Sequence, residues 1–167
     1  MGTKNSLPMA DLRGMLTKIG CTDVQTYVQS GNAVFETKLA TGELTTTIER
    51  ALERYMARPI PTTLRTRSQL QAIVDANPFA KLATNPARLC VTFLSNGPTK
   101  SELAPLHAGE FTPELFQVAG KEIYTWHPNG QARSQLAAAL AKLKLRGAVT
   151  TRNWNTVLTL LGMLGER

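Results

Sequence analysis

The sequence lacks the patterns that identify the commonest enzyme classes. Its two histidines and two cysteines stand too far apart for a metal-ligand set, and it has neither a glycine-rich phosphate loop nor the Gly-x-Ser-x-Gly turn of a serine hydrolase. We therefore expect no metal ion and no cofactor. Since no residue is identified as catalytic, the sequence leaves open whether the protein is an enzyme.

Long apolar runs and a disulfide framework are also absent. No stretch approaches the ~20 apolar residues that cross a bilayer, and residues 1–5 lead into no apolar region of a signal peptide. We therefore expect a cytoplasmic protein with no membrane partner. Cys21 and Cys90 lie far apart and suit small buried residues better than a disulfide or a redox role.

The composition that is present belongs to a globular protein. The chain has 167 residues, of which 43% are apolar and 19% charged, so it can form one ordinary domain or two small ones. Its formal net charge is +7. A basic chain attracts acidic ligands and nucleic acid over a distance, but net charge locates no site.

The first half of the chain alternates between helical and strand-like patterns. The helices are predicted from apolar residues that recur at a helical period, with proline or glycine at the helix ends. The hairpin is predicted from a Ser30-Gly31-Asn32 turn between two runs of strand-forming residues. We predict a helix over 8–19, a hairpin over 23–29 and 33–37, a helix over 43–55, a strand over 62–66 and a helix that Ser68 caps and that carries Leu70, Ile73 and Val74.

The second half repeats this mixture after a proline-containing segment. We predict a strand over 89–94, a helix over 100–106, a hairpin over 115–118 and 122–126, and helices over 134–145 and 153–164. Residues 77–87, which hold two prolines and no apolar period, are the predicted linker between units 1–76 and 88–167. The fold class is therefore α+β, with two related units whose antiparallel sheets carry helices on one face.

A dense polar segment near the C-terminus, residues 150–157, is the strongest candidate for a binding site. If Thr150 or Thr151 caps the last helix, the free N–H groups of the first turn and the guanidinium of Arg152 face one point, where an anion can bind. In the structural alternative Thr151 caps the helix, Trp154 enters the core, and Asn153 and Asn155 hold a loop. The sequence leaves both interpretations open.

Other polar residues have simpler explanations. Asn32 is a candidate ligand contact at a hairpin tip, although Gly-Asn is common in tight turns. His127 and Ser134 can be drawn as a base and a nucleophile, but no third group is placed to orient the histidine, so we expect a turn instead. The basic run over 142–146 complements a helix dipole and favours a solvated surface.

Four separated motifs resemble a bacterial family called domain of unknown function 1697. They occur in the same order as in that family, and they are Leu7–Leu12, Thr26–Asn32, Asn77–Phe79 and Thr151–Val157. The resemblance implies a protein of two ferredoxin-like α/β-sandwich units with no established activity.

The sequence departs from the family pattern in two places. Family members usually open with an apolar strand before the part that matches Lys4 and Asn5, so the first unit is expected to miss its first, central strand. A shortened gene product or a homodimer that fills the open sheet edge would explain this. Family members also tend to carry lysine where this chain has Gln135 and Thr159, which weakens a phosphate-binding interpretation.

Three functional hypotheses follow from these observations. The leading one is binding of a small anionic or polar ligand near the start of the last helix, through residues drawn from Lys4, Asn5, Asn32, Ser134, Thr151, Arg152, Asn153 and Asn155. The second, from charge and fold analogy, is a nucleic-acid-binding module. The third is a structural protein that pairs with another chain through its open sheet edge.

Overall fold

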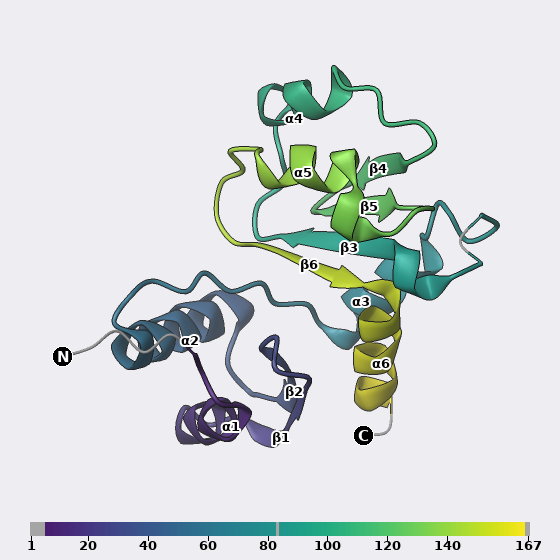
Figure 1. Ribbon diagram of the computed structural model, residues 1–167. Coiled ribbons are helices and arrows are strands. Elements are labelled where there is room, and N and C mark those ends of the chain that lie inside the picture. Colours follow the sequence, from purple (N-terminus) through teal and green to yellow (C-terminus); the bar gives the residue numbers. More distant parts are fainter. Residues whose placement is uncertain (1–5, 83, 166–167) are drawn as a thin grey trace. The chain divides into compact units, whose positions relative to one another are not determined.

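The computed structural model describes residues 6–82 and 84–165 (Figure 1). Backbone contacts divide the chain into two compact units, residues 1–64 with 160–167 and residues 65–159. The segment 77–87, expected as a linker, thus lies inside the second unit. It does so because the helix before it belongs to that unit, where the Tyr124 hydroxyl donates a hydrogen bond to the Ile73 carbonyl.

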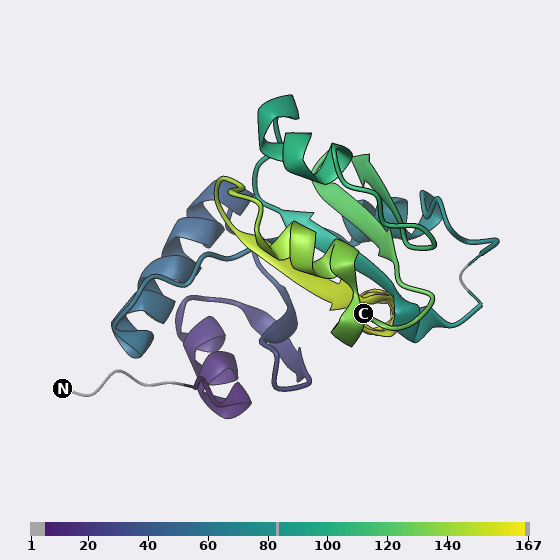
Figure 2. The same cartoon turned by 45° about the horizontal axis from the view of Figure 1, so that its top comes forward.

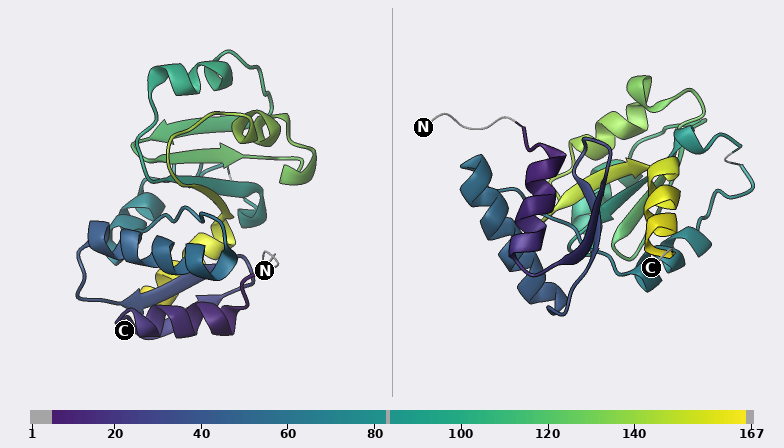
Figure 3. Two further views of the ribbon diagram at one scale, coloured as in Figure 1. Left: turned by 90° about the vertical axis from the view of Figure 1, so that its left-hand side faces the viewer. Right: turned by 90° about the horizontal axis from the view of Figure 1, so that it is seen from below.

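Before residue 64, the first unit consists of two helices and a β-hairpin (Figure 3). In chain order its elements are α1 (Met9–Lys18), β1 (Thr22–Tyr27), β2 (Asn32–Glu36) and α2 (Thr41–Met56). Both helices and the hairpin agree with the sequence-based prediction to within two residues at each end. The two strands pair antiparallel and form a two-stranded sheet.

The core of the first unit lies between the helices and the hairpin. Leucines four residues apart place Leu12 and Leu16 of α1 on one face, where they pack with Leu44, Ile48 and Leu52 of α2. The strands contribute partly buried side chains to the same cluster, which are Val24, Ala33 and Phe35.

Two predictions for the segment after α2 are wrong. Residues 62–66 form no strand, because a strand requires a hydrogen-bonding neighbour. The Thr62 N–H instead donates to Glu49 Oε1 at 2.8 Å. Helix α3 (Arg67–Asp75) is capped by Thr66 and not by Ser68, since Thr66 and Gln69 form a reciprocal capping box.

The second unit is built on a four-stranded antiparallel sheet with the order β4-β5-β3-β6. After α3 its elements are η1 (Pro86–Arg88), β3 (Leu89–Leu94), α4 (Lys100–His107), β4 (Leu115–Ala119), β5 (Glu122–Trp126), η2 (Gln131–Arg133), α5 (Gln135–Ala141), β6 (Val149–Asn153) and α6 (Trp154–Gly165). From β3 to β6 this is the βαββαβ order of a ferredoxin-like unit, and it confirms the α+β class.

Helices contact both faces of this sheet. Helices α4 and α5 lie over one face (Figure 2). There Leu94 of β3 and Ile123 of β5 pack with Leu103 of α4, and Leu140 of α5 joins them. Tyr124 points to the opposite face and reaches α3, a contact that the one-sided arrangement expected from the sequence did not include. Because it is covered on both faces, β3 is buried at every residue.

The last part of the chain also differs from the prediction. Residues 149–153 form strand β6 along the free edge of β3, so the final helix begins at Trp154, and α5 ends at Ala141 instead of continuing to residue 145. Within the described residues, no helix is both long and apolar enough to cross a lipid bilayer.

Candidate functional site

The polar segment 150–155 spans the end of β6 and the start of α6. Asn153 Oδ1 accepts a hydrogen bond from the Thr156 N–H at 2.9 Å, so Asn153 caps α6. The Thr151 hydroxyl lies 2.7 Å from that of Thr92 on β3. The prediction that Thr150 or Thr151 caps the helix is therefore wrong, because both residues belong to the strand. Trp154 is buried, as the structural alternative expected.

Strand alternation separates the polar side chains of this segment. Arg152 lies opposite Val91 and Thr150 lies opposite Phe93, whereas Thr151 lies opposite Thr92. Successive residues of a strand point to opposite faces, so Arg152 and Thr150 share the face away from α4 and α5. The Arg152 guanidinium and the Asn153 cap consequently do not face one common point.

Arg152 is half-buried on the edge strand. Its Nη1 donates to Thr150 Oγ1 at 2.6 Å and to the Thr151 carbonyl at 2.9 Å. Burial lowers the pKa of Arg152 below its usual range, because removing water penalises the charged form. A partly desolvated guanidinium whose orientation is fixed by a neighbouring hydroxyl is suited to bind an anion.

A second guanidinium lies on the same sheet face. Arg65 Cζ is 5.7 Å from the centre of the Phe93 ring, and Arg65 Nη2 is 2.7 Å from Glu122 Oε1. Phe93 pairs across the sheet with Thr150 on one side and Glu122 on the other. We call Arg65, Phe93, Thr150 and Arg152 the arginine face. Sequence reasoning missed Arg65 and Phe93, since only the strand register shows that they lie near Arg152.

Ser134 belongs to a different cluster, centred on His127. His127 Nδ1 lies 2.8 Å from Ser134 Oγ and 3.0 Å from Glu114 Oε1, and its Nε2 lies 2.8 Å from Thr125 Oγ1. The sequence-based statement that no third group orients this histidine is therefore wrong. Glu114 orients it, and no local sequence signal places a residue 13 positions away beside the ring.

This cluster is structural despite its resemblance to a catalytic triad. His127 and Thr125 are each 1% exposed, so a substrate has no access to either side chain. Glu114 Oε2 accepts the Leu136 N–H at 3.0 Å and Ser134 Oγ accepts the Ala137 N–H at 2.8 Å, which satisfies the first turn of α5.

The protonation of Glu114 reflects these contacts. Burial by itself would raise the pKa of Glu114, but hydrogen bonds with Ser134, His127 and the Leu136 N–H outweigh it and hold the pKa below its ordinary value. The carboxylate is thus the favoured form in the folded protein.

The other predicted site residues do not join the arginine face. Asn32 is buried in the first unit, where its Nδ2 donates to the Tyr27 carbonyl at 3.0 Å and to Ser30 Oγ at 2.8 Å, so it closes the hairpin turn. Asn155 is exposed in the first turn of α6. Lys4 and Asn5 lie outside the described residues.

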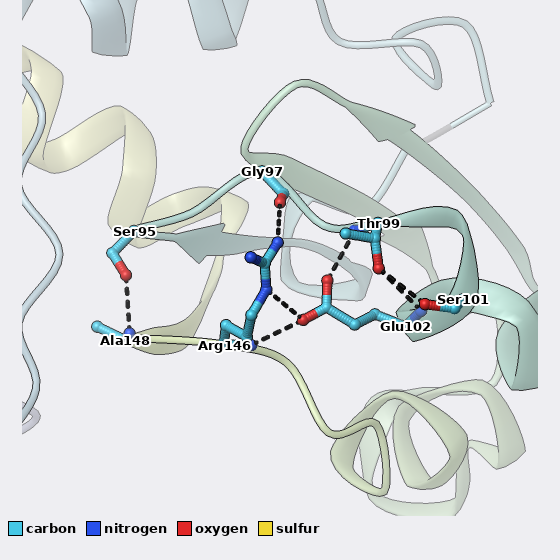
Figure 4. A network of polar contacts seen from close by, with 7 residues as sticks. All are labelled: Ser95, Gly97, Thr99, Ser101, Glu102, Arg146 and Ala148. Carbon is cyan, nitrogen blue, oxygen red and sulfur yellow. Dashed lines mark hydrogen bonds and ion pairs between the residues drawn. The ribbon is translucent and has the colours of Figure 1, made fainter.

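The basic run over 142–146 ends in an ion pair. Arg146 Nε lies 2.9 Å from Glu102 Oε1, and Arg146 Nη2 donates to the Gly97 carbonyl at 3.4 Å (Figure 4). The Thr99 N–H donates to Glu102 Oε2 at 2.7 Å as part of the box that caps α4. The bond from Thr99 and that from Arg146 lower the pKa of Glu102 to about 2.

The two thiols are buried and poorly reactive. Burial raises the pKa of Cys90 to about 11, and it also raises the pKa of Cys21. In the part of the chain that the structure describes, no three His, Cys, Asp or Glu side chains group as metal ligands. Every buried side-chain nitrogen or oxygen in that part has a hydrogen-bond partner. The arginine face, where Thr150 and Arg152 are half-buried, is therefore a better candidate than a fully buried cluster.

Comparisons with known proteins support the fold. Residues 1–124 match the model of a family described as a protein of unknown function, DUF1697, so the matched region ends before the 150–157 segment. The structure of the conserved bacterial protein SP0830 from Streptococcus pneumoniae is similar with a TM-score of 0.80 and 23% sequence identity, covering 98% of this chain and 92% of that one. No curated protein matches the sequence.

Proposed function

We propose that this chain, which belongs to the DUF1697 family of proteins of unknown function, binds a small anionic or polar ligand at the arginine face. The observation that carries the proposal is the half-buried Arg152, held on the edge strand beside the Thr150 hydroxyl. Phosphate and carboxylate groups are the anions that a guanidinium binds with two parallel hydrogen bonds.

The electrostatics of the arginine face favour an anion. The lowered pKa of Arg152 means that burial destabilises its positive charge, and an anion at hydrogen-bonding distance reverses this effect. The proposal concerns binding and assigns no reaction.

A thermal-shift screen tests the ligand-binding proposal. Inorganic phosphate, nucleotides, sugar phosphates and dicarboxylates serve as probes, and a ligand at ~100 times its Kd should stabilise the fold by ~2.7 kcal/mol. The shift should vanish in Arg152→Ala and persist in Arg133→Ala, a matched control on the exposed turn η2. If no probe shifts the transition, or if both variants respond like the original protein, the proposal is wrong.

Nucleic-acid binding is a second proposal, favoured by the distribution of charge. Residues 65–159 hold eleven lysines and arginines against five aspartates and glutamates. Binding through phosphates releases counterions, so the affinity for an oligonucleotide should fall steeply as salt rises. Absent or salt-independent binding would remove this proposal.

Pairing through the open sheet edge is a third proposal. The sheet of the first unit has two strands, a size that is marginally stable alone, and β2 pairs only with β1 among the described residues. A second copy that adds a strand there would satisfy the edge and form a homodimer. Light scattering on protein of verified intact mass should then give twice the chain mass, and a stable folded monomer contradicts it. Cytoplasmic residence stays a prediction.

A further inference from the structure

The positive charge of the protein is concentrated in the second unit. Residues 65–159 carry eleven of the nineteen lysines and arginines but only five of the twelve aspartates and glutamates, which gives this unit +6 of the total +7. The first unit, with eight basic and seven acidic residues, is nearly neutral. A partner attracted by charge is therefore directed to the second unit.

The carboxylates of the second unit are mostly occupied. Glu102, Glu114 and Glu122 each pair with a basic side chain of the same unit, and Asp75 accepts a hydrogen bond from Gln71. These acidic groups are accordingly less able to offset the exposed lysines. The field outside the unit is dominated by those lysines.

Three loops of the second unit meet at one end of the sheet. The Leu94 N–H donates to the Lys121 carbonyl at 2.9 Å, and the Ser95 N–H donates to the Ala148 carbonyl at 3.0 Å. The end of β3 thus contacts the β4–β5 turn, and the first residue of the loop after β3 contacts the loop before β6. Five exposed cations stand on these loops or directly beside them in the chain, and we call them the basic end: Lys100, Lys121, Lys142, Lys144 and Arg146, of which Arg146 is paired with Glu102.

The junction at the basic end is held rigidly. Arg146 ties the loop before β6 to Gly97 and Glu102, and Ser95 Oγ accepts the Ala148 N–H at 2.8 Å (Figure 4). Gly147 has a φ of +76°, and a Cβ added there would lie 2.2 Å from Ser95 Oγ, so the loops approach too closely for a side chain. Lysines on a rigid base lose less entropy when they bind a fixed array of charges.

The sheet faces are less suited to a polymer than this end. Ferredoxin-like RNA binders commonly stack bases on an open sheet face that bears aromatic residues. Here Tyr124 is 1% exposed beneath α3, and Phe93 is 7% exposed beside Arg65. The charge at the loop end, in contrast, is exposed.

We propose that the basic end binds the phosphate backbone of a single-stranded nucleic acid. This inference rests on the second proposed function and names its site. The cations stand at the start of α4, on the β4–β5 turn and on the loop before β6, and a flexible strand can bend to follow them, whereas the phosphates of a duplex are fixed in position. Contacts of this kind are with phosphates and carry little sequence preference.

The test compares two double variants with the same loss of charge. Lys121→Gln with Lys144→Gln changes the basic end, and Lys81→Gln with Arg133→Gln removes two exposed charges in the loop before β3 and in η2. Fluorescence anisotropy with a labelled 20-nucleotide single-stranded RNA, at several salt concentrations, gives the affinity and its salt dependence. Duplex DNA and heparin are measured alongside.

The basic-end variant should bind about 25-fold more weakly at 0.1 M salt, with a salt slope shallower by about 1.4, because each neutralised phosphate of a single strand contributes roughly 0.7 to the slope. The control variant should retain the original slope. If RNA binds but both variants weaken equally, nucleic-acid binding stands and the site is wrong. No saturable binding at low salt overturns both proposals. Equal or tighter binding of duplex DNA or heparin overturns single-stranded nucleic acid as the partner.

Discussion

The two units of this protein share an order of elements but differ in how their strands are paired. In the second unit β3 lies between β5 and β6 and gives both of them a hydrogen-bonding neighbour. In the first unit the hairpin has no such neighbour among the described residues. Residues 62–66, which occupy the position of a last strand in the chain order and cross into the second unit at Arg65, remain non-regular. A central strand thus determines whether the segments beside it become strands.

Matched leucine substitutions, one in each unit, should have the largest effect and test whether the two units unfold separately. Leu106 on α4 is 0% exposed and Leu16 on α1 is 2% exposed, so either change to alanine leaves a cavity and should cost about 3 kcal/mol. Trp126 and Trp154 both lie in residues 65–159. Leu106→Ala should lower the urea midpoint seen by tryptophan fluorescence, whereas Leu16→Ala should lower only a transition seen by circular dichroism. Coincident shifts in both variants would show that the chain unfolds as one cooperative unit.

The reaction rates of the two buried cysteines measure how easily each unit opens locally. Cys21 lies in the first unit and Cys90 on the central strand of the second, and burial raises the pKa of both thiols, so each reacts mainly after local opening. The two-stranded unit should open more easily. We expect Cys21 to react with a thiol reagent on the order of a hundred-fold faster, which corresponds to about 2.7 kcal/mol of opening free energy. Cys21→Ser and Cys90→Ser assign the two rates, and equal rates would contradict the difference in stability.

The Glu114 contacts should make the second unit sensitive to acid. The pKa of Glu114 is lowered in the folded state, so its stabilising effect is fully present above the unfolded value of about 4.5 and is lost as pH falls through the lower folded value. Glu114→Gln should cost about 1.5 kcal/mol at pH 7 and progressively less below pH 4.5. Urea titrations from pH 3 to pH 7 measure this. A constant difference across that range would show that the carboxylate charge is not the cause.

The smallest expected effect concerns the hairpin of the first unit. Val28 has a φ of +50°, a left-handed conformation that β-branched residues rarely adopt. Val28→Asn should stabilise the first unit by about 1 kcal/mol, since asparagine tolerates this conformation and Val28 is 50% exposed. Circular dichroism during urea unfolding gives the change, with the equally exposed Leu82→Asn as a control in the second unit. An unchanged free energy of unfolding would show that the left-handed conformation of Val28 does not destabilise the hairpin.

The predicted site residues illustrate how far a sequence leads to a candidate surface. Thr151, Arg152 and Asn153 stand out in the sequence as polar residues before an apolar helix, and their role as ligand contacts stays a prediction. It could not show that Arg152 points to the face of Phe93 while Thr151 points to that of Thr92, because this depends on strand register with β3. No sequence pattern around Arg65 or Glu114 marks either residue as part of a site. Only tertiary contacts place Arg65 beside Phe93, and only tertiary contacts place Glu114 beside His127.

The sequence by itself determined the helices, the tight hairpins and the α+β class of this protein, because the apolar period of a helix and the residues of a turn are local properties. The tertiary structure decided which extended segments became strands. Residues 62–66 have a strand-like composition but no partner, whereas residues 149–153, which the sequence assigned to a loop and a helix start, pair along β3. The physical reason is that a strand gains its backbone hydrogen bonds from another segment, while a helix makes them within itself.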